Sequence, residues 1–210
     1  KDDDNKQSIL EKGNKNILAY QFKKFIGYKK NVLEVGCGTG QLSNYFAIGT
    51  NNEIIAFDPT IESLKLAQNF ANQNSINNIK FVNADIFDDV LSENYFDFIW
   101  CNGVLHHTKN PYKAFQITSK SLKNNGCIIL LEKILVNDSY LNRSYIDIYY
   151  DYKIKQGYSN IEIQKKREAL ENVLIPYRQS ENYQMLKKSG FKKIDSFFQW
   201  FNWMGFIAIK

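Results

Sequence analysis

The stretch NVLEVGCGTG occupies residues 31 to 40 and decides the fold. Its first five residues form a short apolar run that contains Glu34, and three glycines then alternate with other residues. Glycines suit such a turn because the absence of side chains lets the backbone approach a bound ligand closely. The spacing is GxGxG, whereas dinucleotide folds use GxGxxG with a third glycine at the pyrophosphate end. The stretch therefore predicts a strand, a ligand-binding turn and a helix, and it disfavours a nicotinamide cofactor.

This stretch also resembles motif I of methyltransferases that use S-adenosylmethionine (SAM), a cofactor without a pyrophosphate. The resemblance implies that the cofactor is SAM or its carboxylated derivative. It implies cofactor contacts from Glu34, Gly36, Cys37, Gly38 and Gly40. A purely structural strand-helix connection would give a similar turn, and this stretch alone leaves that alternative open.

Acidic residues follow the next two predicted strands. Asp58 and Pro59 stand at the end of IIAFDP, and both are predicted cofactor contacts. The Asp58 carboxylate could accept hydrogen bonds from both ribose hydroxyls, or the two residues could merely introduce the next helix, with Thr60 as its N-cap. Asp85 closes FVNAD. In the methyltransferases resembled, this position contacts the adenine amino group, with Ile86 beside the ring. An ordinary turn aspartate is the alternative for Asp85.

The fourth predicted strand ends in WCNGVLHHTKNP, which starts at residue 100. Asn102 and the pair His106 and His107 would lie beside the reactive sulfonium. Adjacent histidines point in different directions, so they make a poor metal site, and no metal is expected. One histidine could be a hydrogen-bonding core residue and the other a base, and we predict His106 as catalytic.

Short apolar runs alternate with helix-length segments, as in a mostly parallel sheet flanked by helices. Strands are predicted at residues 31–35, 53–57, 79–83, 96–101 and 127–132, the last entered by a turn at 124–126. Helices are predicted at residues 41–48, 61–72, 112–122, 140–156, 160–173 and 179–189, and a closing hairpin at 191–199 and 202–209. Ser159 and Glu162 form a capping box at the start of one helix.

The predicted architecture is an α/β, Rossmann-like class I methyltransferase fold. Its seven-stranded, mostly parallel sheet would end in a C-terminal antiparallel hairpin. We expect one domain over residues 1–210, because this length supports one sizeable core. Residues 30–132 would form the cofactor-binding core, and residues 138–176 a helical insertion on the substrate side. That insertion would cover the carboxyl edge of the sheet, where such folds bind ligands.

Composition limits the other classes of function. The three cysteines form no CxxC and lie in apolar runs, which indicates reduced core thiols rather than disulfides or structural zinc. No apolar run approaches the roughly 18 residues of a membrane span, and the polar start lacks the features of a signal peptide. A cytoplasmic protein that does not enter the membrane is therefore expected.

The net charge of +5 is unevenly distributed. Residues 1–132 carry as many acidic residues as lysines, so the excess lies in the last third, together with all three arginines. A solvated basic face would explain this pattern. An anionic substrate or a nucleic-acid surface near the tail would also explain it.

From Glu132 onward the chain reads LEKILVND, DYKIKQGYSNIEIQKKREALENVLIP and ENYQMLKKSGFKKIDSFFQWFNWMGFIAIK. Over nearly 80 residues this is similar to the carboxy-S-adenosyl-L-methionine (carboxy-SAM) synthase family. That family makes the carboxylated cofactor used to modify wobble uridine in tRNA. The resemblance implies a small anionic substrate, prephenate, which yields phenylpyruvate while the methyl carbon of SAM acquires a carboxylate. The arginine of KREALENV, Arg167, matches the family's carboxylate-binding residue, a role that suits a bidentate guanidinium.

The chain departs from that family at three places. The family usually has a serine at the position of Gly38, a histidine-free sequence in place of VLHHTKNP, and a tyrosine upstream of the first strand, which residues 5–16 lack. The N-terminal half is closer to small-molecule methyltransferases. A methyltransferase acting on a small or nucleic-acid acceptor, with His106 or a group near Asp85 assisting deprotonation, is therefore a second hypothesis.

A third hypothesis is a non-catalytic SAM-binding protein whose basic tail recruits tRNA or a protein partner. Direct nucleic-acid binding is left open by the sequence. The aromatic residues of the tail exceed what one sheet face needs, so part of them could be buried in a homodimer. They are Phe197, Phe198, Trp200, Phe201, Trp203 and Phe206.

Overall fold

The computed structural model describes residues 5–170 and 173–210, which form two compact units. The first unit contains the chain through Cys101 together with Lys120–Ile128. The second contains Asn102–Ser119 and Ile129–Lys210. Helix α5 and strand β5 contribute residues to both.

The elements of the N-terminal half are α1 (Lys6–Lys15), α2 (Ile17–Ile26), β1 (Asn31–Val35), α3 (Gln41–Ala47), β2 (Glu53–Asp58), α4 (Ile61–Gln73), β3 (Ile79–Asn83) and β4 (Phe96–Asn102). A 3₁₀ turn (Leu105–His107), α5 (Pro111–Ser121), β5 (Leu122–Leu135), α6 (Ser139–Lys155) and α7 (Asn160–Leu170) follow. The chain closes with β6 (Tyr177–Arg178), α8 (Gln179–Lys188), β7 (Lys193–Trp200) and β8 (Trp203–Ile209).

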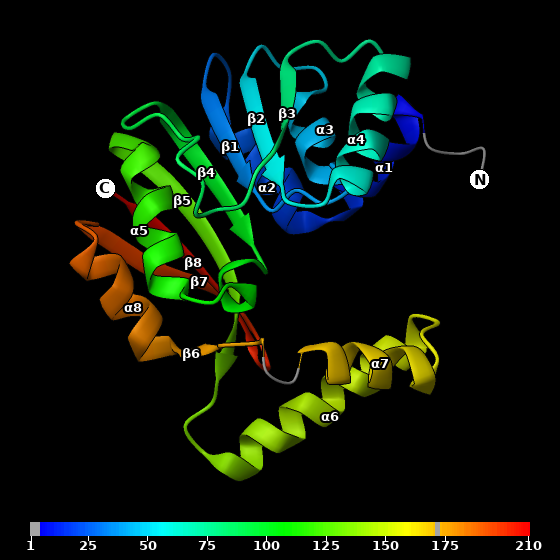
Figure 1. Ribbon diagram of the computed structural model, residues 1–210, viewed down its shortest axis with the longest axis vertical. Coiled ribbons are helices and arrows are strands. Elements are labelled where there is room, and N and C mark those ends of the chain that lie inside the picture. Colours follow the sequence, from blue (N-terminus) through cyan, green and yellow to red (C-terminus); the bar gives the residue numbers. More distant parts are fainter. Residues whose placement is uncertain (1–4, 171–172) are drawn as a thin grey trace. The chain divides into compact units, whose positions relative to one another are not determined.

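The first unit is built on parallel strands in the order β3-β2-β1-β4. Leu33 in β1 pairs with Ile55 of β2 on one side and Ile99 of β4 on the other. Strands covered on both faces are expected to be apolar along their length, and Val32 and Leu33 are fully buried. Helices α3 and α4 lie beside β2 and β3 (Figure 1). The carboxyl ends of β1, β2 and β3 therefore meet at one edge of the sheet.

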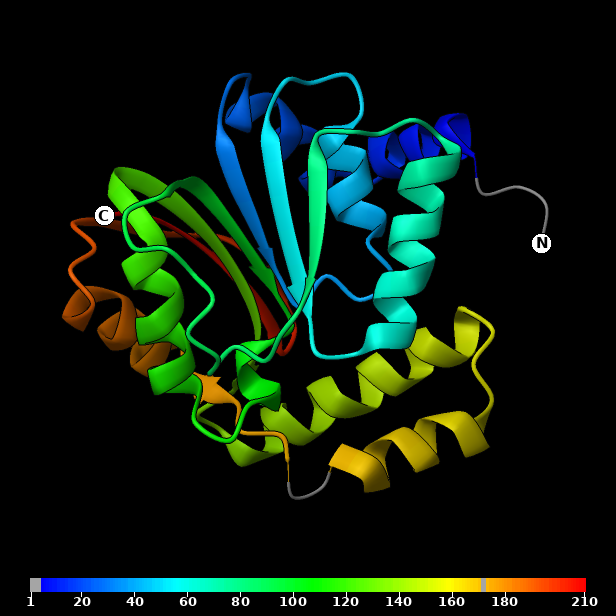
Figure 2. The same ribbon diagram turned by 45° about the horizontal axis from the view of Figure 1, so that its top comes forward.

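The second unit is a smaller sheet with helices. Strands β7 and β8 form an antiparallel hairpin, β8 lies next to β5, and the short β6 pairs with β5 in parallel through Ile134. Helices α6 and α7 form a helical pair (Figure 2). Helix α6 has 17 residues and buries none of them, yet its tyrosines contact the hairpin. Tyr152 packs edge-on against Trp200 at 4.9 Å, and Tyr145 against Phe201 at 5.3 Å.

The structure confirms the α/β fold with its C-terminal antiparallel hairpin and corrects several details. Eight strands, rather than seven, occur among the described residues, because the two-residue β6 has too little sequence pattern to predict. The turn predicted at 124–126 is wrong. Strand β5 begins at Leu122, directly after α5. Within it, Asn125 adopts a left-handed backbone conformation with a φ of 64°. The end of the helix predicted at 160–173 includes residues outside those described.

Two N-terminal helices were not predicted. Helix α1 is too polar to show a clear apolar stripe, although its asparagine caps are visible in the sequence. Asn5 accepts a hydrogen bond from the Ser8 backbone N–H, and Asn16 caps α2 through Ala19 in the same way. Across the described residues, the helices are too short or too polar to cross a bilayer.

Gly13 of α1 lies against the ring of Tyr45 in α3. A Cβ atom at position 13 would stand only 2.2 Å from Cδ2 of Tyr45, whose side chain is 1% exposed and cannot easily move. Gly13→Ala should therefore destabilise the protein by about 1–2 kcal/mol, because overpacking outweighs the gain in helix propensity. Urea unfolding measures this, with Lys15→Ala at an exposed position of α1 as the control. Unchanged or increased stability of Gly13→Ala would contradict the packing described.

Candidate functional site

The glycine turn after β1 has space for a ligand on one side and packs tightly on the other. Gly40 has a φ of 69°, and a Cβ atom there would stand 2.6 Å from the Cβ of Ala67. Gly38 also has a positive φ, of 53°, but a Cβ atom there would meet nothing within 4 Å. The backbone at Gly38 is therefore open to a bound group, whereas Gly40 is required for helix packing.

Asp58 at the end of β2 is tied to this turn. Its carboxylate accepts a hydrogen bond from the Gly38 N–H at 2.8 Å and another from the Thr60 N–H at 2.9 Å. The side chain is largely buried, at 9% exposed. Each carboxylate oxygen can accept a second hydrogen bond, so the geometry leaves capacity for a ribose hydroxyl. Asp58 thus introduces the next helix and also borders the predicted cofactor turn.

Glu34 and Cys37 lie beneath the turn. Burial raises the pKa of Glu34 to about 8, so its carboxyl is largely neutral at pH 7, and it accepts a hydrogen bond from the Ser43 hydroxyl of α3. Burial likewise raises the pKa of the Cys37 thiol to about 12. Both side chains therefore support the turn as neutral groups, and direct cofactor contact from them stays a prediction.

Asp85 follows β3 and is exposed, while Ile86 beside it is buried. The Asp85 carboxylate accepts a hydrogen bond from the Phe87 N–H at 2.9 Å, as in the turn-aspartate alternative. Asn83 ties the end of β3 to that of β2, because its amide donates to the carbonyls of Asp58 and Pro59 at 3.0 Å. The predicted adenine contact of Asp85 and Ile86 stays a prediction.

The second unit contains a separate cavity of about 690 Å³. Its lining combines cations with aromatic rings: Lys133, Lys153, Lys166 and Arg167 with Tyr149, Tyr150 and Trp203. The predicted residues Asn102, His106 and Arg167 all border it. No acidic side chain of the described residues is part of the lining. A cavity with several cations and no carboxylate is suited to an anionic ligand.

The pKa of Lys133 reflects its burial in this cation-rich lining. Burial, with smaller contributions from the nearby charges of Lys153 and Lys166, lowers its pKa to about 8. Its ammonium lies 4.9 Å from the centroid of the Tyr149 ring, and Lys153 lies 4.8 Å from the same ring. Cation–π contacts of this kind partly replace water around a buried ammonium.

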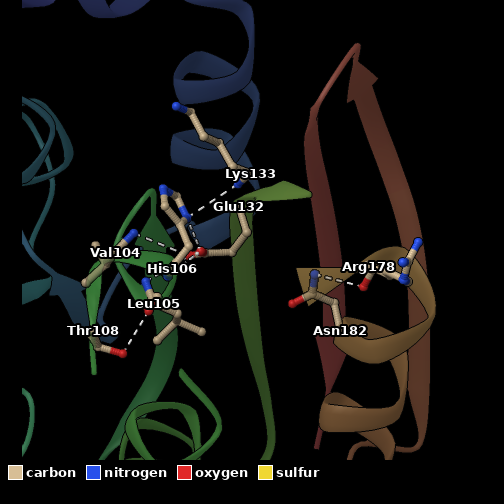
Figure 3. Close-up of polar contacts among 8 residues, drawn as sticks. All are labelled: Val104, Leu105, His106, Thr108, Glu132, Lys133, Arg178 and Asn182. Carbon is tan, nitrogen blue, oxygen red and sulfur yellow. Dashed lines mark hydrogen bonds and ion pairs between the residues drawn. The ribbon is translucent and has the colours of Figure 1, made fainter. Parts of the chain in front are cut away.

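Glu132, at the β5 end next to Lys133, holds the 3₁₀ turn that carries the histidines (Figure 3). Its carboxylate accepts hydrogen bonds from the backbone N–H groups of Val104, Leu105 and His106 at 3.0–3.3 Å. It also contacts Nδ1 of His106 directly. His106 is 2% exposed, so it is the core-facing, hydrogen-bonded histidine of the pair.

His107 differs from its neighbour. Burial is the largest of the causes that lower its pKa to about 4, so this ring is neutral at pH 7. The described residues include no group of three or more His, Cys, Asp or Glu placed to hold a metal ion.

The sequence did not single out Lys133, Glu132 or the tyrosines of α6. Lys133 and Glu132 stand in LEKILVND, so the family resemblance offered a signal for them. Tyr149 and Tyr150 had none, because a tyrosine-rich helix is more often a packing face. Arg167, on α7, lines the cavity and is also exposed. It is therefore solvated, as arginines on helix surfaces usually are, and it still borders the cavity.

Comparison with known proteins defines the family. A family model described as a methyltransferase domain matches residues 26–190. The carboxy-SAM synthase of Nautilia profundicola is 37% identical over 98% of this chain and 88% of its own length. The chain belongs to the carboxy-SAM synthase family. The family's synthase from Campylobacter jejuni strain 81-176 is 38% identical over 93% of the chain and 81% of its own length.

Solved structures support the fold of this family member. A SAM-dependent methyltransferase from Aquifex aeolicus matches with a TM-score of 0.64 at 16% identity, over 97% of each chain. At that identity the likeness concerns the fold alone. The predicted family and the class I methyltransferase fold are both confirmed.

The pKa of Lys133 predicts how the cavity binds anions. Because Lys133 is charged below about pH 8 and neutral above it, affinity for a small dicarboxylate such as malonate should fall as pH rises from 7 to 9.5. The loss of one charged contact corresponds to about tenfold. Calorimetry measures the affinity. Lys133→Arg should remove most of the fall because a guanidinium keeps its charge, whereas Lys187→Arg on α8 should not. An equal fall in Lys133→Arg would show that another group is responsible.

Proposed function

We propose that this protein is a carboxy-SAM synthase that converts SAM and prephenate to carboxy-SAM, phenylpyruvate and water. The observation that carries the proposal is the cavity in which Arg167 stands with Lys133, Lys153 and Lys166 and without a described acidic neighbour. Prephenate carries two carboxylates and a ring, which match the cations and the aromatic residues of that lining. Membership of the synthase family points to the same reaction.

The turn after β1 fits the cofactor that this reaction needs. Gly38 offers open backbone, and Asp58 keeps acceptor capacity beside it, so these residues would hold the nucleoside, with Asp85 and Ile86 as the adenine contacts. Asn102 is a further proposed cofactor contact. SAM would supply an activated methyl carbon attached to its sulfonium. The chain's own cations would bind the carboxylates and orient the second substrate.

The proposed product would serve the modification of wobble uridine in tRNA, which would place the protein in the cytoplasm. The basic excess of the last third could then serve substrate binding alone, without direct nucleic-acid contact. A homodimer would suit α6, because Tyr140 is 78% exposed and Tyr152 45% exposed on a helix that buries no residue.

Methyl transfer to a small or nucleic-acid acceptor is the second candidate. It is favoured by Nε2 of His106, a buried nitrogen for which the described structure offers no partner and which could accept a proton from an acceptor substrate. Formation of S-adenosylhomocysteine with an acceptor, without a prephenate-dependent product, would select it over carboxyl transfer.

The central prediction concerns Arg167. Purified protein given SAM and prephenate should form a cofactor heavier by one carboxyl group, detected by mass spectrometry. Arg167→Ala should reduce this activity by at least about 100-fold, because a substrate carboxylate loses its bidentate partner, and Arg167→Lys should restore only part of it. Arg143→Ala, on the exposed part of α6, is the matched control. Absence of the carboxylated product with the unaltered protein would refute the proposed reaction.

A second prediction concerns the cofactor. Asp58→Ala removes the acceptor of the Gly38 N–H and the predicted ribose contact, so SAM affinity should fall by about 10- to 100-fold. Equilibrium dialysis or calorimetry with SAM measures this. Asp89→Ala, an exposed aspartate after β3, should bind SAM as the unaltered protein does. Equal affinity of Asp58→Ala would place the nucleoside elsewhere.

A further inference from the structure

The buried carboxylate of Glu132 interacts with four nitrogen donors, all of which belong to one short turn. It is 2% exposed and accepts from three consecutive backbone N–H groups, those of residues 104 to 106, as well as contacting His106 Nδ1. A buried carboxylate is stable only when its lone pairs are filled, and these contacts fill them. The turn and the ring of His106 are therefore fixed together by one side chain.

This arrangement determines which nitrogen of His106 carries the proton. A carboxylate accepts and does not donate, so the contact with Glu132 requires a proton on Nδ1. The Lys133 backbone N–H also approaches Nδ1, but at 3.4 Å it is a weak contact and cannot compete with the carboxylate. Where the ring is neutral, Nε2 is therefore bare and acts as a hydrogen-bond acceptor.

Nε2 of His106 is buried and lacks a hydrogen-bond partner among the described residues. The residue borders the cationic cavity together with Lys133 and Trp203. The Trp203 ring stands edge-on to the imidazole, with centroids 5.8 Å apart, so it packs against the ring. A buried acceptor without a partner is costly, and a ligand in the cavity that brings a donor would remove this cost.

We propose that Nε2 of His106 accepts a hydrogen bond from a hydroxyl group of the anionic second substrate, and that Glu132 is the positioning residue that fixes the required tautomer. The inference rests on the proposed function and narrows its substrate class. The ligand is an anion that carries a hydroxyl donor, rather than any small dicarboxylate. The cations bind the carboxylates, and His106 distinguishes ligands by the donor.

Imidazole ¹⁵N NMR tests the positioning role directly, because the chain has only two histidines. The ligand-free protein should show His106 protonated at Nδ1 and bare at Nε2, with His106→Asn providing the assignment. Glu132→Gln should produce a mixture of tautomers while leaving His107 unchanged. A ring of His106 that carries its proton at Nε2, or at both nitrogens, would overturn the proposal.

Binding tests the recognition role. Prephenate should shift the Nε2 resonance of His106, and its affinity should fall about tenfold in His106→Asn, whose amide keeps a donor for Glu132 but has no atom at Nε2. Phenylpyruvate lacks the hydroxyl, so its affinity should be the same in both proteins. An equal loss for both ligands, or an Nε2 resonance that prephenate does not move, would overturn the recognition claim.

These readouts are independent of turnover. If carboxy-SAM fails to form while prephenate still moves Nε2, the proposed reaction fails and the site described here stands. If carboxy-SAM forms while Nε2 does not respond, only the role of His106 is lost.

Discussion

Mutual repulsion among cations is the constraint on which the cavity of the second unit depends. Lys133 stands close enough to Lys153 and Lys166 for their charges to lower its pKa in addition to burial. No described carboxylate in the lining relieves this. A fold selected for stability alone would place an acid there, or apolar residues of similar size. A ligand with negative charge would remove this repulsion, so its binding would be favoured at such a site.

The predicted cofactor turn is built on the opposite principle. The acidic side chains of this turn are either protonated or hydrogen-bonded without a ligand. Glu34 is largely protonated at pH 7, Cys37 keeps its proton, and Asp58 accepts hydrogen bonds from two backbone N–H groups. The turn is therefore shaped by backbone conformation and hydrogen bonds. A cofactor with a sulfonium and neutral sugar hydroxyls suits such a surface better than a pyrophosphate would, because the N–H groups of Cys37, Gly38 and Gly40 already have acceptors.

Much of the fold could be predicted because parallel strands buried on both faces are nearly continuous apolar runs. Strands β1, β2 and β4 matched the predicted ranges to within one residue for this reason, whereas the edge strand β3 matched its range although it buries none of its five residues. Helix α1 and strand β6 could not be predicted in the same way, since a polar ten-residue helix and a two-residue strand depend on tertiary contacts that leave no periodic pattern. Strand β5 was predicted too short because Asn124 and Gly126 are ordinary turn residues. Only the backbone shows that Asn125 takes the bend within the strand.

The residues of the candidate site also fall into those that the sequence predicts and those that it does not. The glycine turn and Asp58 were visible because their chemistry follows from their place at strand ends, and Arg167 because of the family resemblance. Lys133 and Glu132 are adjacent in the sequence, yet alternation along β5 gives them opposite surroundings: one lines a cation-rich cavity and the other fills a buried turn. Neither residue alone predicts these different surroundings, because they depend on the turn at residues 104–106 lying against Glu132 of β5.

The departures of this chain from the family pattern concern backbone conformation more than charge. Gly38 has room for a side chain, since a Cβ atom would meet nothing within 4 Å, but its φ of 53° would cost an ordinary residue about 1 kcal/mol or more. A serine there would therefore favour a different local backbone and would not merely add a hydroxyl.

The histidines belong to a second departure, a turn whose three backbone N–H groups donate to Glu132. In this loop the turn and the His106 ring are fixed together. The cations of the cavity and Arg167 are untouched by either departure. The elements that would bind the second substrate can therefore be those of the family even where the loops around them resemble methyltransferases.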